Sequence, residues 1–279
     1  MIRYLPVGYQ EALKLTLDHL APLAPEAVPL EESVGRVVAC DLQARVDSPS
    51  VDASLRDGYA VRSKDLIGVS ADNPVHLEIT GSLSAGSCSA MTVQPGTTIR
   101  VLTGAKVPSN ADAILAEEYV KIQGDHILAL KTAEPGRNIL PKGSDVRLGQ
   151  SIIQPGDLIT PGLAGLLAAA GHSQISVIKN PSVSIIATGD EVVAPGKPLG
   201  EGKLYASNII TLHAWCRRYG LQSRLAVLKD DSRLLEQALE QAAGESDAIV
   251  TSGGAWTGDR DMMVKVLNPT ALPGPIRIL

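Results

Sequence analysis

The sequence predicts a protein of the α/β plus β class, in which an α/β domain with a mainly parallel sheet follows a split helical and mixed domain that carries an inserted small β domain. Three observations lead to this prediction. Apolar residues follow a helical period near the amino end, alternate in the β manner over residues 73–134, and mark strands that alternate with helices after residue 180. The expected boundaries are 1–45 and 136–178 for the split domain, 46–135 for the β domain, and 179–279 for the three-layer α/β domain.

The split domain is predicted from two helical segments that lie far apart in the chain. Residues 8–23 place apolar side chains on a mainly helical period, and Pro22 closes the run. A second, apolar helix is expected at 161–170, where Gly171 provides its C-terminal stop. The segment between the two helices therefore interrupts one unit.

The inserted domain is predicted as a small antiparallel β unit. Its alternating segments are separated by the turn-forming residues Gly, Pro, Asn and Asp, and they read VHLEITGSL, TTIRVLTGA, ADAILAEEYVKI and HILAL. Upstream, residues 28–62 break into short apolar pieces at Gly35, Pro49 and Gly58, which is typical of short strands and an exposed loop.

The α/β domain is predicted from a regular alternation after Asn180 and Pro181. Three segments with strand character, VSIIATGDEVV, QSRLAVLKDD and DAIVTSGG, alternate with the helical segments SNIITLHAWCRRYG and SRLLEQALEQAAG. This alternation predicts a parallel, doubly wound sheet with right-handed crossovers. Such sheets bind ligands beyond the carboxyl ends of their strands.

Acidic residues follow all three predicted strands of this sheet. Crowded carboxylates repel one another unless a cation enters, and oxygen ligands favour a hard ion such as Mg²⁺. The alternative is that these acids cap helices, which suits the pair that precedes SRLLEQAL. The three pairs are Asp190 with Glu191, Asp230 with Asp231, and Asp259 with Asp261.

Two glycines, Gly253 and Gly254, end the third strand. Backbone N–H groups that are freed at such a turn can bind phosphate or another oxyanion, although an ordinary tight turn also uses glycine. Neither a P-loop nor the dinucleotide fingerprint occurs in the sequence. ATP hydrolysis and nicotinamide binding by those routes are therefore disfavoured.

Composition excludes several classes of function. The net charge of -5 argues against bulk nucleic-acid binding, and no apolar stretch approaches the roughly 20 residues of a membrane span. The three cysteines and five histidines are scattered without the spacings of a disulfide framework or a transition-metal site. Without a secretory signal pattern, a cytoplasmic location is expected.

Six motifs, in order along the chain, resemble the molybdopterin molybdenumtransferase family, which comprises the MoeA proteins and the gephyrin E domain. The resemblance runs from about residue 5 to the end. The motifs are VDASLRDGYAVR, IRVLTGAKVPSNADAIL, GRNILPKGSDVRLGQSII, VSIIATGDEVVAPG, GKLYASN and TSGGAWTGDRD.

This resemblance implies an enzyme of molybdenum cofactor biosynthesis. Such an enzyme inserts molybdate into adenylylated molybdopterin and releases AMP in a step that Mg²⁺ assists. The resemblance also implies a molybdopterin-binding α/β domain and an elongated homodimer, with no nucleic-acid or membrane partner. The alternatives are a non-catalytic molybdopterin-binding or scaffold protein of the same fold, and a generic Mg²⁺-dependent phosphohydrolase.

The family's functional positions can be carried over to this sequence motif by motif. The implied catalytic acids are Asp57 in RDGYAVR, Asp145 in KGSDV, Glu191 in TGDE, Asp230 in LKDD and Asp261 in GDRD, and Asp230 and Asp261 are also the implied Mg²⁺ ligands. Asp230 rather than Asp231 is chosen after one assumed gap. The implied substrate-binding residues are Thr103, Thr188, Gly189, Asp190, Ser252, Gly253, Gly254, Trp256 and Gly258.

The sequence departs from the family pattern at three places. Trp256 replaces a small serine and is expected to reshape the pocket or to stack on a pterin or adenine ring. The D-N-S-A-M-D-G pattern has become DASLRDG at residues 52–58, which loses an amide and adds a charge. The sequence ends before the family's K-P-G-K-P and G-N-P segments, so we expect these residues to lack its last small β domain.

Overall fold

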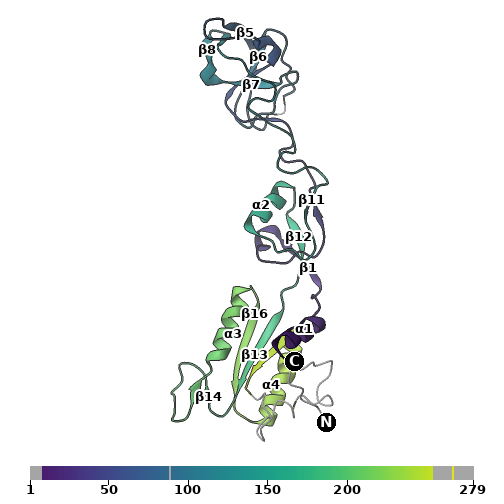
Figure 1. Cartoon of the computed structure of the whole chain (residues 1–279), viewed down its shortest axis with the longest axis vertical. Helices are drawn as coiled ribbons and strands as arrows, with labels where there is room; N and C mark the ends of the chain where they lie inside the picture. Colours follow the sequence, from purple (N-terminus) through teal and green to yellow (C-terminus); the bar gives the residue numbers. More distant parts are fainter. Residues whose placement is uncertain (1–7, 88, 254–265, 267–279) are drawn as a thin grey trace. The chain divides into compact units, whose positions relative to one another are not determined.

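A computed structural model of the chain describes residues 8–87, 89–253 and 266 (Figure 1). The chain forms two compact units. The α/β unit comprises Met1–Val28, Gly35–Ala39 and Ser176–Leu279, and the β-rich unit comprises Pro29–Val34 and Cys40–Ile175. The predicted boundaries after residues 45, 135 and 178 stay a prediction.

The α/β unit contains the predicted parallel sheet. Within the described residues, β13 (Ser182–Thr188) lies between β16 (Gln222–Leu228) and β17 (Ala248–Ser252), and both pairings are parallel. The connecting helices are α3 (Ser207–Arg218) and α4 (Ser232–Glu245), as the alternation of strands and helices predicts.

The two faces of β13 carry separate cores because successive residues of a strand point to opposite sides. Ile185 belongs to a cluster with Ile209 of α3, and Ile186 belongs to another with Leu235 and Leu239 of α4. The two helices thus pack on opposite faces of the central strand. The unit also contains α1 (Tyr9–His19), which the sequence predicts, and the short parallel pair β14 (Val192–Val193) and β15 (Leu204–Tyr205).

A six-stranded sheet forms the largest part of the β-rich unit, with the order β7-β4-β6-β5-β9-β8. Figure 1 labels β5, β6, β7 and β8 of this sheet. Buried side chains cover both of its faces, Tyr59 and Leu77 in one cluster and Ile99 and Ile114 in the other. The strands are β4 (Gly58–Val61), β5 (Val75–Leu83), β6 (Thr97–Val101), β7 (Ala113–Ala116), β8 (Val120–Gln123) and β9 (His126–Ala129).

The prediction of a purely antiparallel β unit is wrong for one pair of strands. β5 and β6 pair in parallel, whereas the other pairings of this sheet are antiparallel. Parallel neighbours need a crossover of about a dozen residues, and the segment at 84–96 is long enough to supply it. Alternation along each strand predicts the strand but not the direction of its neighbour.

The rest of the β-rich unit surrounds α2 (Pro161–Ala169). The predicted helix begins at Pro161, where Thr160 Oγ1 accepts a hydrogen bond from the Leu163 N–H group, and Gly171 has a positive φ of 90° just beyond it. Two-stranded sheets of this unit join β2 (Leu42–Gln43) to β11 (Ser151–Ile153) and β3 (Ala53–Ser54) to β10 (Ile139–Leu140). A further two-stranded sheet joins β1 (Pro25–Pro29) to β12 (Gln174–Ile178), and most residues of both strands belong to the α/β unit.

Short 3₁₀ turns complete the described elements, at Leu30–Glu32, Ser63–Leu66 and Glu117–Tyr119. Among the described helices, none combines the length and the apolar composition that a membrane crossing requires.

Candidate functional site

Polar side chains meet at the carboxyl ends of β13 and β16 in the α/β unit. The Thr188 hydroxyl donates a hydrogen bond to Asp230 Oδ1 at 2.9 Å, and the Asp230 N–H group donates to Asp190 Oδ1 at 3.4 Å. Parallel pairing in register places Thr188 opposite Leu228, so the residues that follow both strands come together. The structure therefore brings three predicted site residues to one edge of the sheet.

The two neighbouring acids Asp230 and Asp231 have different partners. Asp231 is the N-cap of α4, because its Oδ1 accepts hydrogen bonds from the N–H groups of Arg233 at 2.8 Å and Leu234 at 3.1 Å. Capping, one of the two alternatives for this pair, is therefore correct for Asp231. Asp230 instead contacts Thr188, which favours Asp230 as the candidate site acid.

Glu191 folds back over Gly189 at the end of β13. Gly189 has a φ of 152°, and a Cβ atom there would lie 2.8 Å from both carboxylate oxygens of Glu191. Lys203 Nζ donates to the Asp190 carbonyl at 2.8 Å, so a cation lies beside these acids. The predicted site segment from Thr188 to Glu191 thus forms one compact turn. This turn carries the carboxylates of Asp190 and Glu191 together with backbone N–H groups.

Gly253 lies against the end of the central strand. Its φ is 101°, and a Cβ atom at this position would lie 2.3 Å from the Thr188 carbonyl oxygen. No side chain fits in that space, so glycine is required here by both conformation and contact. Ser252 Oγ accepts a hydrogen bond from Asn208 Nδ2 at 3.2 Å, and both line a cavity of about 70 Å³ with Val192 and Tyr205.

Four predicted site residues lie outside the described residues, namely Gly254, Trp256, Gly258 and Asp261. One of the two predicted Mg²⁺ ligands, Asp261, is among these four. Over residues 8–87, 89–253 and 266, no three His, Cys, Asp or Glu side chains gather as a metal site would require. Asp230 offers carboxylate oxygens of the kind that Mg²⁺ prefers, and it is one of the two predicted ligands.

Asp57 and Thr103 form a pair in the β-rich unit. Asp57 Oδ1 accepts hydrogen bonds from the backbone N–H and the hydroxyl of Thr103, both at 2.7 Å. These two donors, the backbone one first, hold the pKa of the Asp57 carboxyl below its usual value of 3.8. The exposed Asp57 side chain is therefore a carboxylate at neutral pH, and Thr103 of the segment IRVLTGAKVPSNADAIL holds it in place.

Asp145 lies on a loop, residues 141–148, that other acids hold in place. Ser48 Oγ donates to Asp145 Oδ2 at 3.3 Å, and the Asp145 N–H group donates to the Ser48 carbonyl at 2.9 Å. On either side, Asp52 Oδ1 accepts from the Lys142 N–H group at 2.7 Å, and Asp47 Oδ1 accepts from the Leu148 N–H group at 2.9 Å.

Asp47 makes a second contact with the same loop. Its Oδ2 lies 3.1 Å from Lys142 Nζ, and the hydrogen bond from Leu148, followed by that from Lys142, lowers the pKa of the Asp47 carboxyl. Sequence reasoning missed Asp47 and Asp52 as supports for Asp145. Their signal was weak, since two acids around a Ser-Pro turn also suit a solvated loop.

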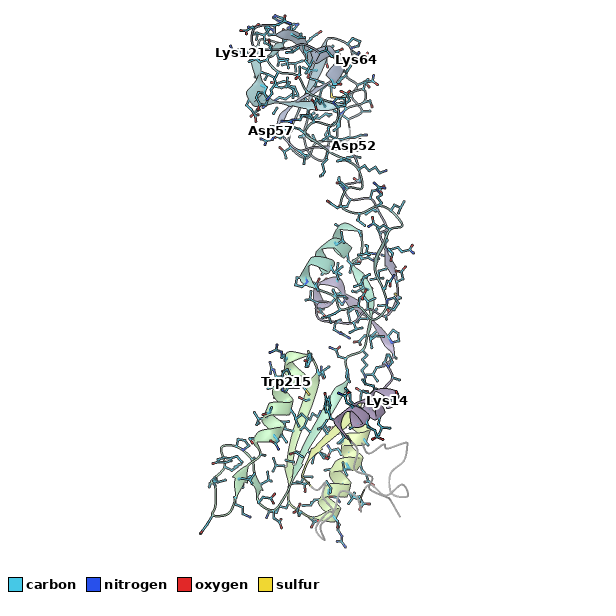
Figure 2. The ribbon with its side chains drawn as sticks, in the orientation of Figure 1. Lys14, Asp52, Asp57, Lys64, Lys121 and Trp215 are labelled. Atoms are coloured by element: carbon cyan, nitrogen blue, oxygen red, sulfur yellow. The ribbon has the colours of Figure 1, made fainter. Side chains whose placement is uncertain are left out.

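The candidate residues thus fall into two groups. The strand-end group of the α/β unit contains Thr188, Gly189, Asp190, Glu191, Asp230, Ser252 and Gly253. The loop group of the β-rich unit contains Asp57, Thr103 and Asp145, and Figure 2 labels Asp57 together with Asp52 at one end of the six-stranded sheet.

Two family models match the chain. Residues 7–171 match the "MoeA N-terminal region (domain I and II)", and residues 184–273 match a "Probable molybdopterin binding domain". The first match covers more than half of the chain, and the second covers the strand-end group.

Similar proteins carry consistent names. "Molybdopterin molybdenumtransferase 2" of Mycobacterium tuberculosis is 36% identical over 250 residues, which are 89% of this chain and 62% of the relative. "Molybdopterin molybdenumtransferase" of Staphylococcus aureus is 31% identical over 262 residues, 94% of this chain and 62% of the relative. The chain thus spans 62% of the length of these relatives.

A solved structure agrees with these matches. The molybdopterin biosynthesis MoeA protein of Pyrococcus horikoshii superimposes with a TM-score of 0.79 at 32% sequence identity. The superposition covers 93% of this chain and 66% of that structure. The fold of the chain is therefore MoeA-like.

Proposed function

Because the chain belongs to the MoeA family, we propose that it acts in molybdenum cofactor biosynthesis, inserting molybdate into adenylylated molybdopterin with release of AMP. One observation carries the proposal. Thr188, Asp190 and Asp230 meet at the carboxyl edge of a parallel sheet, within the segment that matches a molybdopterin-binding domain. This edge is where doubly wound sheets bind their ligands.

We assign substrate binding to the turns at the strand ends. The backbone N–H groups of Gly253 and Gly254 are assigned to a phosphate, as the sequence motif suggests, and Gly253 lies against Thr188. Ser252 and Asn208 line the adjoining cavity. Trp256 and Gly258 are assigned to the same substrate, in line with the family motif.

Mg²⁺ is assigned to Asp230 and Asp261, whose carboxylates are suitable ligands for a hard cation. When bound, Mg²⁺ would neutralise charge on the phosphoanhydride that is cleaved. Asp230 is oriented by the Thr188 hydroxyl, while Glu191 and Asp190 supply further acceptors for hydrogen bonds from the substrate. No protein nucleophile is needed.

The loop group is assigned to molybdate and to proton transfer. Asp57 is a fixed carboxylate with Oδ1 held by Thr103, so Oδ2 is the oxygen that can accept a hydrogen bond from a hydroxyl of protonated molybdate. Asp145 is a second acid of this kind. We further propose a homodimer in the cytoplasm, on the resemblance alone.

The decisive experiment incubates the 279-residue chain with adenylylated molybdopterin, Mg²⁺ and molybdate and measures AMP release and active cofactor. Asp230→Asn should slow AMP release by at least about tenfold, since charge is lost where it is required. Asp231→Asn is the matched control, because this neighbour caps α4 and should leave the rate within about twofold.

Two results would count against the proposal. AMP release that persists in Asp230→Asn would remove that acid from the reaction. A chain that binds molybdopterin in equilibrium dialysis but never releases AMP would instead be the non-catalytic molybdopterin-binding or scaffold protein of the same fold.

A further inference from the structure

An aromatic and basic surface lies at the C-terminal end of α3. Trp215 is 49% exposed and Tyr219 is 65% exposed, while Arg217 and Arg218 between them are also exposed. The guanidinium carbon of Arg218 lies 5.4 Å from the centroid of the Trp215 ring. Arg218 and Tyr219 lie three and four positions after Trp215, on the same side of the helix, and we call these three residues the α3 surface; Figure 2 labels Trp215 on this helix.

The core of the α/β unit does not use this surface. α3 already packs Ile209, Leu212 and Cys216 against the sheet, and His213 Nδ1 lies 2.7 Å from Ser223 Oγ of β16. The Trp215 and Tyr219 side chains are on the remaining, solvent-facing part of the helix.

The two rings stack against each other at the end of the helix. Their centroids are 5.9 Å apart with an interplanar angle of 18°. The helix ends in a Schellman motif, in which the Leu221 N–H group donates to the Cys216 carbonyl at 2.8 Å and Gly220 adopts a φ of 70°. A surface whose rings already stack in the unbound chain loses less conformational entropy when a partner binds than one whose rings must first come together.

The charge of the surface is not balanced locally. Within the described residues, Arg217 and Arg218 take part in no ion pair, whereas Arg224 nearby in sequence pairs with Glu245. The chain as a whole carries a net charge of -5, so this pair of arginines is a local exception. Positive charge of this kind selects a negative partner and speeds its association.

We infer that the α3 surface binds an acidic segment of another protein. Trp, Tyr and Arg are the residue types that most often dominate the energy of protein interfaces, and here all three lie side by side. The partner places a carboxylate against Arg218 and an apolar side chain against the stacked rings. The inference does not depend on the proposed function.

The test uses an array of short synthetic peptides in which Asp and Glu surround one Leu, Pro or Tyr, beside a matched array with Lys in place of every acid. The wild-type chain should bind acidic peptides, and added salt should weaken binding because exposed charges are screened. Trp215→Ala and Arg218→Glu should each raise the Kd for the strongest acidic peptide at least about tenfold.

Two variants control for nonspecific loss of binding. Tyr9→Ala removes another exposed ring, and Arg233→Glu reverses another exposed charge, so both should bind as the wild type does. Circular dichroism and thermal melting confirm folding, and Tyr219→Ala replaces Trp215→Ala if the latter fails to fold.

Three outcomes would overturn the inference. The first is equal binding of the acidic and basic arrays, and the second is unchanged binding in both α3 variants. The third is a change in molar mass by light scattering in Trp215→Ala, because this would make a second copy of the chain the occupant of the surface.

Discussion

The strand-end group and the loop group are built by different kinds of contact. In the α/β unit, parallel register and a backbone contact between Gly253 and Thr188 bring the candidate residues together. In the β-rich unit, the side chains of Asp47 and Asp52 hold the Asp145 loop through hydrogen bonds that bridge 101 and 90 positions of sequence. Substitution of a glycine should therefore disrupt the strand-end group, whose residues are brought together by backbone contacts. Substitution of a single aspartate should disrupt the loop group, whose residues are held by side-chain hydrogen bonds.

The largest effect is expected where the backbone contact is tightest. Gly253→Ala would force a Cβ atom against the Thr188 carbonyl oxygen in an unfavourable φ region, and it should lower the free energy of unfolding by about 3 kcal/mol. Urea denaturation measures this change. Gly244→Ala is the control, because that helical glycine has open space around it and should gain about 0.5–1 kcal/mol. An unchanged midpoint for Gly253→Ala would contradict the contact.

The next effect tests the side-chain anchors of the loop group. Asp47→Asn weakens the acceptor for Leu148 and the ion pair with Lys142, so the Asp145 loop should shift. If the proposed function holds, AMP release should fall on the order of tenfold to a hundredfold, since misplacement by about 1 Å costs this much. Asp41→Asn, an acid of the same unit that contacts Ser151, should leave the rate unchanged. Full activity of Asp47→Asn would show that Asp145 needs no such support.

A smaller effect separates the two adjacent acids of the α/β unit. Asp231→Ala removes the N-cap of α4 and should lower the free energy of unfolding by about 1 kcal/mol. Asp230→Ala leaves the cap in place and should cost less stability. Thermal melting of both variants measures the difference, and a larger loss for Asp230→Ala would reverse the roles assigned here.

The smallest effect is a pH dependence that both units share. Hydrogen bonds to the carboxylates lower the pKa of Asp47 and Asp57 in the β-rich unit and that of Asp247 in the α/β unit. A depressed folded-state pKa contributes stability above the unfolded value near 3.8, and this contribution is lost as the pH falls through the folded-state pKa.

Hydrogen exchange of peptides from each unit between about pH 2 and 6 measures the loss. Asp57→Asn should weaken the pH dependence of the β-rich unit alone, where Asp47 keeps its own contribution, and Asp247→Asn should weaken that of the α/β unit alone. Equal profiles for a variant and the wild type would mean that the corresponding carboxylate contributes no stability.

The strand-end group could be predicted from sequence to a useful degree. Alternating strands and helices predict a parallel sheet, and the fold then brings the residues after each strand to one edge, as Asp190 and Asp230 illustrate. The choice between Asp230 and Asp231 needed the structure, because an acid before a helix can serve as a cap or as a ligand. The roles of both groups of residues stay a prediction.

The loop group could not be predicted from residue patterns alone. Nothing local in the sequence links Asp47 to Leu148 or Asp52 to Lys142, because such contacts depend on the path of a distant segment. The pair of Asp57 and Thr103 was reached only through the family motifs. The parallel pairing of β5 and β6 was missed for the same physical reason, since strand periodicity carries no information about direction.

The order of strands in the six-stranded sheet determines which strand pairs can form first while the chain is being synthesised. β4 precedes both of its neighbours, so its pairing with β6 must wait until residue 101 has been made, and its pairing with β7 until residue 116. β8 and β9 are joined directly at residues 124–125 and can close as a hairpin within microseconds. Synthesis adds roughly 5–20 residues per second. The first strand of this sheet to be made, β4, therefore stays unpaired on the ribosome for longer than the strands that follow it.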